Sequence, residues 1–162
     1  MERIHIGSTS DLLLQVSRQL QTRGWALLCS ETGHHRYQFT VGLELSYEHP
    51  ELEVIGLPPD LGGDLLAGLV ERVKSGQRLR SGDFFSDLLR GYDLFVLNNP
   101  IDPGGPPITG GRLRLIWPDA HGRFPWQPDC DPSCTVQARI LEPDGMNVQG
   151  LETLLAHSGR SA

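Results

Sequence analysis

Two side chains that could carry acid–base chemistry, His49 and Glu51, flank a proline in this 162-residue sequence. Pro50 fixes its own φ angle and favours an extended conformation for His49, so residues 49–51 form a stiff connection. Side chains two residues apart on an extended chain point to the same side, which brings the imidazole and the carboxylate together. The pair could act as general acid and base, or it could bind a polar ligand. The structural alternative is that His49 bonds a backbone carbonyl and Glu51 pairs with an arginine.

A second group of chemically capable side chains lies in the ten residues from Trp117 to Trp126. This segment contains two tryptophans, two prolines, Asp119 and Arg123. A rigid turn with aromatic walls and a few fixed polar groups has the composition of a small binding pocket. The structural alternative is that both indoles close one end of the core while Asp119 makes a tight turn with Gly122.

We predict that these two segments meet at one rim of the protein and form a small aromatic-lined cleft. The candidate ligand-binding residues are Thr40, His49, Glu51, Trp117, Asp119, Arg123 and Trp126. The chain has no nucleophile with a base at a recognised spacing, no phosphate-binding loop and no metal-ligand motif, so we expect no metal and no cofactor. The favoured function is a non-catalytic binding or regulatory module for a small ligand, a peptide or a protein partner.

Two other functions stay open. The first is a small enzyme in which His49 is the general base, Glu51 or Asp119 orients it and Arg123 holds an anionic group. The second is a protein-interaction module of the immunity type, which would have a large exposed apolar patch instead of a cleft. The sequence does not decide whether the protein catalyses a reaction.

Alternating apolar and polar residues predict the strands that position these segments. The predicted strands are residues 25–29, 37–43, 52–57, 92–97, 112–117 and 135–140. Apolar residues at helical spacing predict one helix that begins near Asp11 and stops at Gly24, and a second that begins near Asp60 and stops at Gly76; residues 83–89 resemble a short helical turn. We expect a single α+β domain over residues 1–162, with a mostly antiparallel sheet of five or six strands and the two main helices covering one face.

The remaining segments support weaker predictions. Residues 98–111 contain four prolines and four glycines, which favours a lid or a connector over an element of regular structure. A last strand and a short closing helix are expected within residues 134–157. Cys130 and Cys134 have a three-residue gap and no second pair at the spacing of a zinc site, so we expect free thiols.

Composition and charge exclude several classes of partner. The formal net charge is −6 and the Lys and Arg residues are scattered, so there is no continuous basic face for nucleic acid. No apolar run approaches the roughly 20 residues of a membrane span, and the first residues lack the pattern of a signal peptide. The three cysteines are not needed to staple a chain of this length, which favours a reducing, cytoplasmic compartment.

Four motifs in a fixed order resemble a bacterial family catalogued as domain of unknown function 4262. They are residues 37–43 (Tyr-Gln-Phe-Thr-Val-Gly-Leu), residues 49–52 (His-Pro-Glu-Leu), the end of the second predicted helix at residues 73–76, and the Trp-Pro-Asp turn of residues 117–126. The resemblance covers roughly residues 23–130. It implies an α/β domain in a cytosolic bacterial protein and brings no established activity.

Overall fold

The computed structural model describes residues 3–5, 9–32 and 35–138. In chain order the elements are β1 (Ile4–His5), α1 (Thr9–Arg23), β2 (Ala26–Thr32), β3 (His35–Val41), α2 (Leu43–Tyr47), β4 (Leu52–Ile55), α3 (Pro59–Lys74), β5 (Phe84–Leu89), β6 (Tyr92–Leu97), β7 (Leu113–Ile116), α4 (Pro132–Thr135) and the 3₁₀ turn η1 (Val136–Ala138). The closing helix predicted from Val148, Leu151, Leu154 and Leu155 lies outside the described residues.

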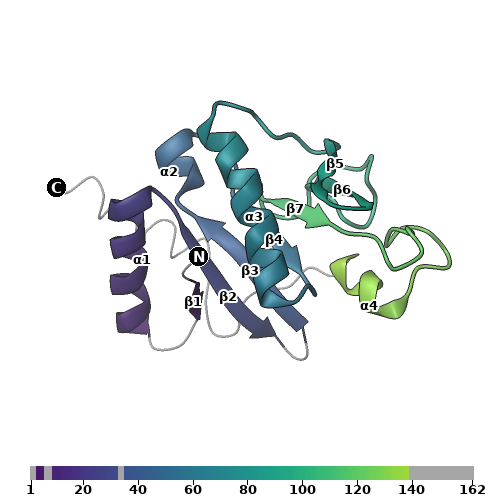
Figure 1. Ribbon diagram of the computed structural model, residues 1–162, viewed down its shortest axis with the longest axis horizontal. Helices are drawn as coiled ribbons and strands as arrows, with labels where there is room; N and C mark the ends of the chain where they lie inside the picture. Colours follow the sequence, from purple (N-terminus) through teal and green to yellow (C-terminus); the bar gives the residue numbers. More distant parts are fainter. Residues whose placement is uncertain (1–2, 6–8, 33–34, 139–162) are drawn as a thin grey trace.

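The described strands form one seven-stranded sheet in the order β1-β2-β3-β4-β7-β6-β5. Pairing is antiparallel except for β1 with β2 and β4 with β7, which are parallel. The α+β class is confirmed, whereas the expected five or six strands become seven. Parallel pairing of β4 with β7 is possible because the chain between them is long enough to return to the same edge of the sheet (Figure 1).

Two of the elements differ in type from the sequence prediction. Residues 83–89, which resemble a helical turn, contain strand β5, because Phe84 and Phe85 pair with Phe95 and Leu94 of β6. The predicted last strand at 135–140 is wrong over its described part, which is the end of α4 and the turn η1. Its described residues belong to a helical turn that covers the sheet, and the successive residues Val136 and Gln137 are both buried, which an alternating strand pattern does not allow.

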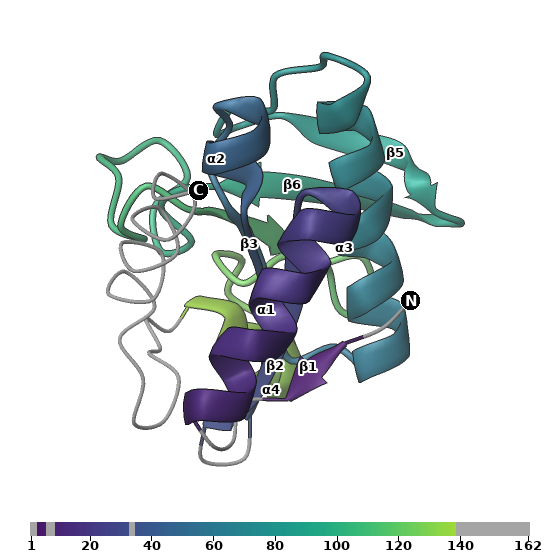
Figure 2. The same cartoon turned by 90° about the vertical axis from the view of Figure 1, so that its left-hand side faces the viewer.

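The two long helices cover opposite faces of the sheet, which corrects the prediction that they share one face. Leu28 of β2 belongs to the apolar cluster of α1, while the adjacent Leu27 belongs to the cluster of α3. Neighbouring residues on a strand point to opposite faces. Figure 1 shows α3 in front of the strands, and Figure 2 shows that α1 and α3 lie apart from each other. The sheet is therefore buried from both sides in its central part.

The first turn of α3 approaches the sheet closely because it contains two glycines. A Cβ atom on Gly62 would overlap with the side-chain oxygen of Gln38 on β3, and a Cβ on Gly63 would lie 3.2 Å from Leu27. Gln38 in turn donates from Nε2 to the carbonyl oxygen of Pro59 at 3.0 Å. These glycines serve close helix–sheet packing.

A charged pair lies inside the core between the parallel strands. Glu53 of β4 and Arg114 of β7 are neighbours in register, and Arg114 Nη2 lies 3.3 Å from Glu53 Oε2 with both side chains about 1% exposed. Arg114 also donates to the carbonyl oxygen of Gln137 in η1 at 2.7 Å. The pair therefore ties the centre of the sheet to the turn that covers it.

The loop of residues 98–111 is fixed at its beginning by one side chain. Asn99, which is 5% exposed, accepts hydrogen bonds from the backbone N–H groups of Ile101 and Asp102 and donates to the carbonyl oxygen of Pro106 at 2.8 Å. This arrangement is an Asx turn. The proline-rich loop is therefore held by local side-chain hydrogen bonds and does not need to form a helix or a strand.

Candidate functional site

Glu51 is buried and bound to the start of helix α2. Its carboxylate accepts a hydrogen bond from the Thr40 hydroxyl at 2.8 Å and from the backbone N–H groups of Gly42 at 3.0 Å, Leu43 at 3.1 Å and Glu44 at 3.3 Å. The first N–H groups of a helix have no partner within the helix, and Gly42, the N-cap residue, has no side chain to offer. Glu51 supplies the missing acceptors from the next strand.

Thr40 completes this arrangement. Its hydroxyl donates to Glu51 and accepts from the backbone N–H of Leu52 at 2.9 Å. Thr40 and Glu51, two of the predicted site residues, are thus in direct contact. Their hydrogen-bonding groups are used to hold β3, α2 and β4 in register.

His49 is also committed to the backbone. It is 1% exposed, its Nε2 accepts from the N–H of Leu79 at 2.9 Å, and its Nδ1 lies 2.8 Å from the carbonyl oxygen of Pro50. This pattern requires the proton on Nδ1. Burial, and to a smaller extent Arg78, lowers the pKa of the imidazole, in agreement with a neutral ring. The expected bond from His49 to a backbone carbonyl is present.

Asp119 organises the turn that follows β7. Its carboxylate accepts from the backbone N–H groups of His121 and Arg123 at 2.9 Å and from that of Asp131 at 3.0 Å. The hydrogen bond from the Arg123 N–H is the main cause that lowers the pKa of Asp119. Gly122 donates to the carbonyl oxygen of Asp119 at 3.0 Å, which is the tight turn anticipated as the structural alternative.

Trp117 and Arg123 also bond to the backbone. The indole N–H of Trp117 donates to the carbonyl oxygen of Ile55 at 2.9 Å, and its ring lies against Gly56, where a Cβ would be 3.1 Å away. Arg123 Nη1 donates to the carbonyl oxygen of Asp129 at 2.7 Å. The segment 117–126 is therefore anchored to the end of β4.

The predicted cleft between residue 49 and the turn at 117–126 is not formed, which corrects the central sequence hypothesis. Leu52 pairs with Leu113 where β4 and β7 both begin, and Leu113 donates to the carbonyl oxygen of Glu51 at 2.9 Å. Because the strands are parallel, His49 and Glu51 lie where the pair begins and Trp117 lies where it ends. Figure 1 shows α2 at the top of the sheet and the chain after β7 at the lower right.

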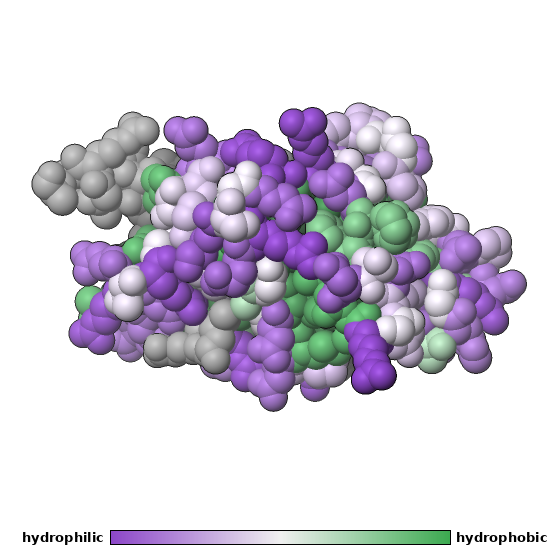
Figure 3. All heavy atoms as spheres, turned by 45° about the horizontal axis from the view of Figure 1, so that its top comes forward, coloured by the Kyte–Doolittle hydropathy of each residue, from purple (hydrophilic) through white to green (hydrophobic). Residues whose placement is uncertain are grey.

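An aromatic cluster that the sequence analysis missed lies at the β5–β6 end of the sheet. Phe124 and Trp126 stack with ring centroids 5.1 Å apart and an interplanar angle of 6°, and Phe95 meets both edge-on at 5.0 and 5.7 Å. Phe84 lies 5.9 Å from Phe95 and is 57% exposed. We call Phe84, Phe95, Phe124 and Trp126 the aromatic cluster. Figure 3 shows hydrophobic surface in the region of β5 and β6.

One predicted site residue, Trp126, belongs to this cluster. The other members could have been found by pairing residues 84–89 and 92–97 as a hairpin. That pairing places Phe84 opposite Phe95. Pairing of residues 83–89 as a strand was not predicted, so the cross-strand contact was invisible in the sequence.

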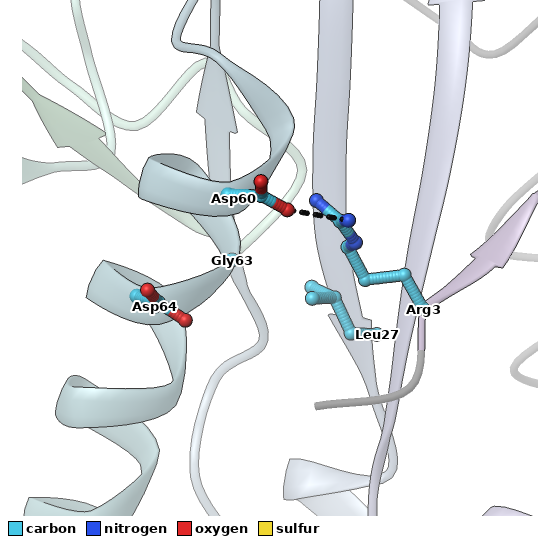
Figure 4. A pocket seen from close by; sticks show the side chains of 5 residues that line it. All are labelled: Arg3, Leu27, Asp60, Gly63 and Asp64. Atoms are coloured by element: carbon cyan, nitrogen blue, oxygen red, sulfur yellow. Dashed lines mark ion pairs between the residues drawn. The ribbon is translucent and has the colours of Figure 1, made fainter.

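A pocket of about 290 Å³ lies elsewhere, between β2 and the first turns of α3. It is lined by Arg3, Leu27, Asp60, Gly63 and Asp64, and Figure 4 shows Arg3 reaching across to Asp60, with Nη2 and Oδ1 2.6 Å apart. None of the predicted site residues lines it. The Arg3 guanidinium, the only cationic group among the lining residues, is therefore already paired with Asp60, whose side chain is exposed.

The described residues contain neither a metal-binding group nor a membrane span. Within the part of the chain that the structure describes, no group of three or more His, Cys, Asp or Glu side chains is arranged to hold a metal ion. None of the described helices is both long enough and apolar enough to span a bilayer.

These features define an α+β domain built on one mixed sheet, in which the motif side chains support the backbone and an aromatic cluster lies at the open end. The chain belongs to the family described as Domain of unknown function (DUF4262), which matches residues 19–100. The match includes the motifs at 37–43 and 49–52 and ends before the turn at 117–126. No curated protein and no solved structure has significant similarity to the chain.

Proposed function

We propose that this protein is a non-catalytic binding module that uses the aromatic cluster to bind an extended segment of a partner protein. The observation that carries the proposal is the exposure of Phe84, which is 57% accessible beside the stacked pair of Phe124 and Trp126. Covering a phenylalanine side chain contributes about 1.5–3 kcal/mol. Trp and other aromatic residues with few rotatable bonds are typical anchors of protein interfaces.

The position of Phe84 supports an extended partner. It is the first residue of β5, which is the last strand in the sheet order of the described residues. An open strand edge can accept an added strand through its backbone groups, while side chains on one face supply specificity. A register shift between Phe85 and Leu89 and the exposed Asp87 disfavour pairing further along β5. The first half of β5, next to the cluster, is the favourable part.

Two alternatives have less support. A small ligand would favour an enclosed site, and none of the candidate ligand-binding residues lines the pocket of Arg3 and Asp60. Catalysis by His49 would need a free ring nitrogen, whereas both of its nitrogens lie at hydrogen-bond distance from backbone groups. A cytoplasmic location is part of the proposal, supported by the three unpaired thiols.

A library of random peptides displayed on phage tests this function. We expect enrichment of peptides with an aliphatic or aromatic residue, and a loss of at least about tenfold in affinity, or 1.4 kcal/mol, for Phe84→Ser in calorimetric titrations. Leu14→Ser is the matched control, because Leu14 is 52% exposed on the distant helix α1. Failure to enrich any peptide, or equal affinity of the Phe84 and Leu14 variants, refutes the proposal.

A further inference from the structure

Two thiols converge on one carbonyl group behind the turn at 117–126. The Sγ atoms of Cys130 and Cys134 lie 3.6 and 3.7 Å from the carbonyl oxygen of Arg123. Because both sulfur atoms lie within hydrogen-bond range of one oxygen atom, the two thiols are held close to each other. Cys130 precedes the N-cap residue Asp131 and Cys134 lies in α4, so only three residues separate them. Neither thiol has a role in the binding surface proposed above.

We propose that Cys130 and Cys134 are a redox-active dithiol that a small disulfide, such as glutathione disulfide, converts into an intramolecular disulfide. Disulfides of cytosolic proteins are usually transient and serve in sensing or catalysis, so two free thiols held beside one carbonyl oxygen fit this role. The inference does not depend on the proposed partner binding.

The exchange proceeds in two balanced steps. The Cys130 thiolate attacks one sulfur of glutathione disulfide, forms a mixed disulfide and releases one glutathione thiolate, which takes up the proton that Cys130 lost. Cys134 then gives up its proton and attacks the Cys130 sulfur, releasing the second glutathione, which is protonated in turn. Two protein thiols are oxidised and one glutathione disulfide is reduced to two glutathione molecules.

The environments of the two thiols set this order. Cys130 is 9% exposed and Cys134 is fully buried, so an oxidant reaches Cys130 first. Burial, followed by the influence of the Cys130 side chain, raises the pKa of Cys134, which therefore stays protonated until the mixed disulfide brings an electrophile beside it. The third cysteine, Cys29, lies on β2 and accepts a hydrogen bond from Gln38 Nε2 at 3.5 Å.

Oxidation changes the hydrogen bonding of the turn. The carbonyl oxygen of Arg123 loses the Cys130 donor, and the single proton of Cys134, which is shared between Arg123 and Trp117, is lost as well. Arg123 directly precedes Phe124 of the aromatic cluster. The carbonyl oxygen of Trp117 loses the Cys134 donor at 3.3 Å but keeps the Gln137 Nε2 donor at 2.7 Å. We therefore expect the fluorescence of Trp126 to respond to the redox state.

Intact-mass spectrometry and thiol counting on the whole protein test the inference. After incubation with glutathione disulfide, the wild type should lose two of its three thiols and two hydrogen atoms, and dithiothreitol should restore both. Cys29→Ser should behave in the same way. Cys134→Ser should accumulate a glutathione adduct at Cys130, and Cys130→Ser should form neither adduct nor disulfide.

Three results would overturn the inference. These are wild-type protein that keeps all three thiols under fully oxidising glutathione, a peptide map that places the disulfide at Cys29, or no adduct in Cys134→Ser. Measurement on the wild type requires no variant to fold. A reversible change of tryptophan fluorescence that is absent in Cys130→Ser would support the link between the dithiol and the turn.

Discussion

Replacement of Glu51 by glutamine isolates the role of one buried carboxylate. The two oxygens of Glu51 accept from Thr40 and from the N–H groups of Gly42, Leu43 and Glu44. Glutamine has nearly the same shape but only one oxygen. If that oxygen keeps the donors of Thr40 and Leu43, the new NH₂ group faces the N–H groups of Gly42 and Glu44.

The expected loss follows from those two donors. A hydrogen bond to a charged group contributes about 1.5–3 kcal/mol, so the two hydrogen bonds lost from Gly42 and Glu44 destabilise the fold by about 3 kcal/mol or more. For a domain of this size, the midpoint of thermal unfolding should fall by roughly 6–12 °C. The 3% exposure of Glu51 leaves little access for water to replace the acceptors.

Urea denaturation and thermal melting of Glu51→Gln measure this loss. Glu44→Gln is the control, since Glu44 is exposed in the first turn of α2 and should change the free energy of unfolding by less than about 1 kcal/mol. If Glu51→Gln is as stable as the control, the carboxylate does not hold the start of α2 and the structural interpretation of the motif at 49–52 is wrong.

Two further predictions concern buried ionisable groups. As pH falls through about 6.5, His49 takes up a proton in the unfolded chain, whereas burial lowers its pKa in the native state; stability should therefore drop below this pH by up to about 1.4 kcal/mol per pH unit. Urea titrations should show a flatter slope for His49→Asn, and parallel slopes would contradict the assignment. Arg114→Met should cost about 3–5 kcal/mol because Glu53 is left charged and unpaired in the core. Adding Glu53→Leu should recover most of that loss in the same assay, and a double variant no more stable than Arg114→Met would contradict it.

The sequence predicted the local elements better than their arrangement. Helix α1 and strands such as β6 were predicted from the periodicity of their apolar residues. The end of α1 was predicted from Gly24, which has a left-handed φ of +88° in the structure. Residues 83–89 were misassigned because two phenylalanines, a serine and an aspartate fit a helical turn as well as a strand. Pairing with β6, a tertiary effect, decides the outcome.

The predicted cleft is absent because β4 and β7 run parallel to each other. The sequence places His49 before β4 and Trp117 after β7 but says nothing about which way the two strands run. Antiparallel strands would have brought these residues to one rim, and the parallel pairing separates them. The alternating pattern of residues 112–117 was also misleading at Arg114. In a strand with one exposed face Arg114 would point to solvent, but here η1 covers it.

The place of β7 in the sheet also constrains how the chain reaches its native state. These four residues lie between β4 and β6, although they are later in the sequence than both. Until β7 docks, the meander β1 to β4 and the hairpin β5–β6 are two fragments with open edges that are prone to pair with other chains. Docking of β7 joins contacts that are distant along the chain, so it should be the slow step of folding. We therefore expect the facing edges of β4 and β6 to stay open in a nascent chain until residue 116 has left the ribosome.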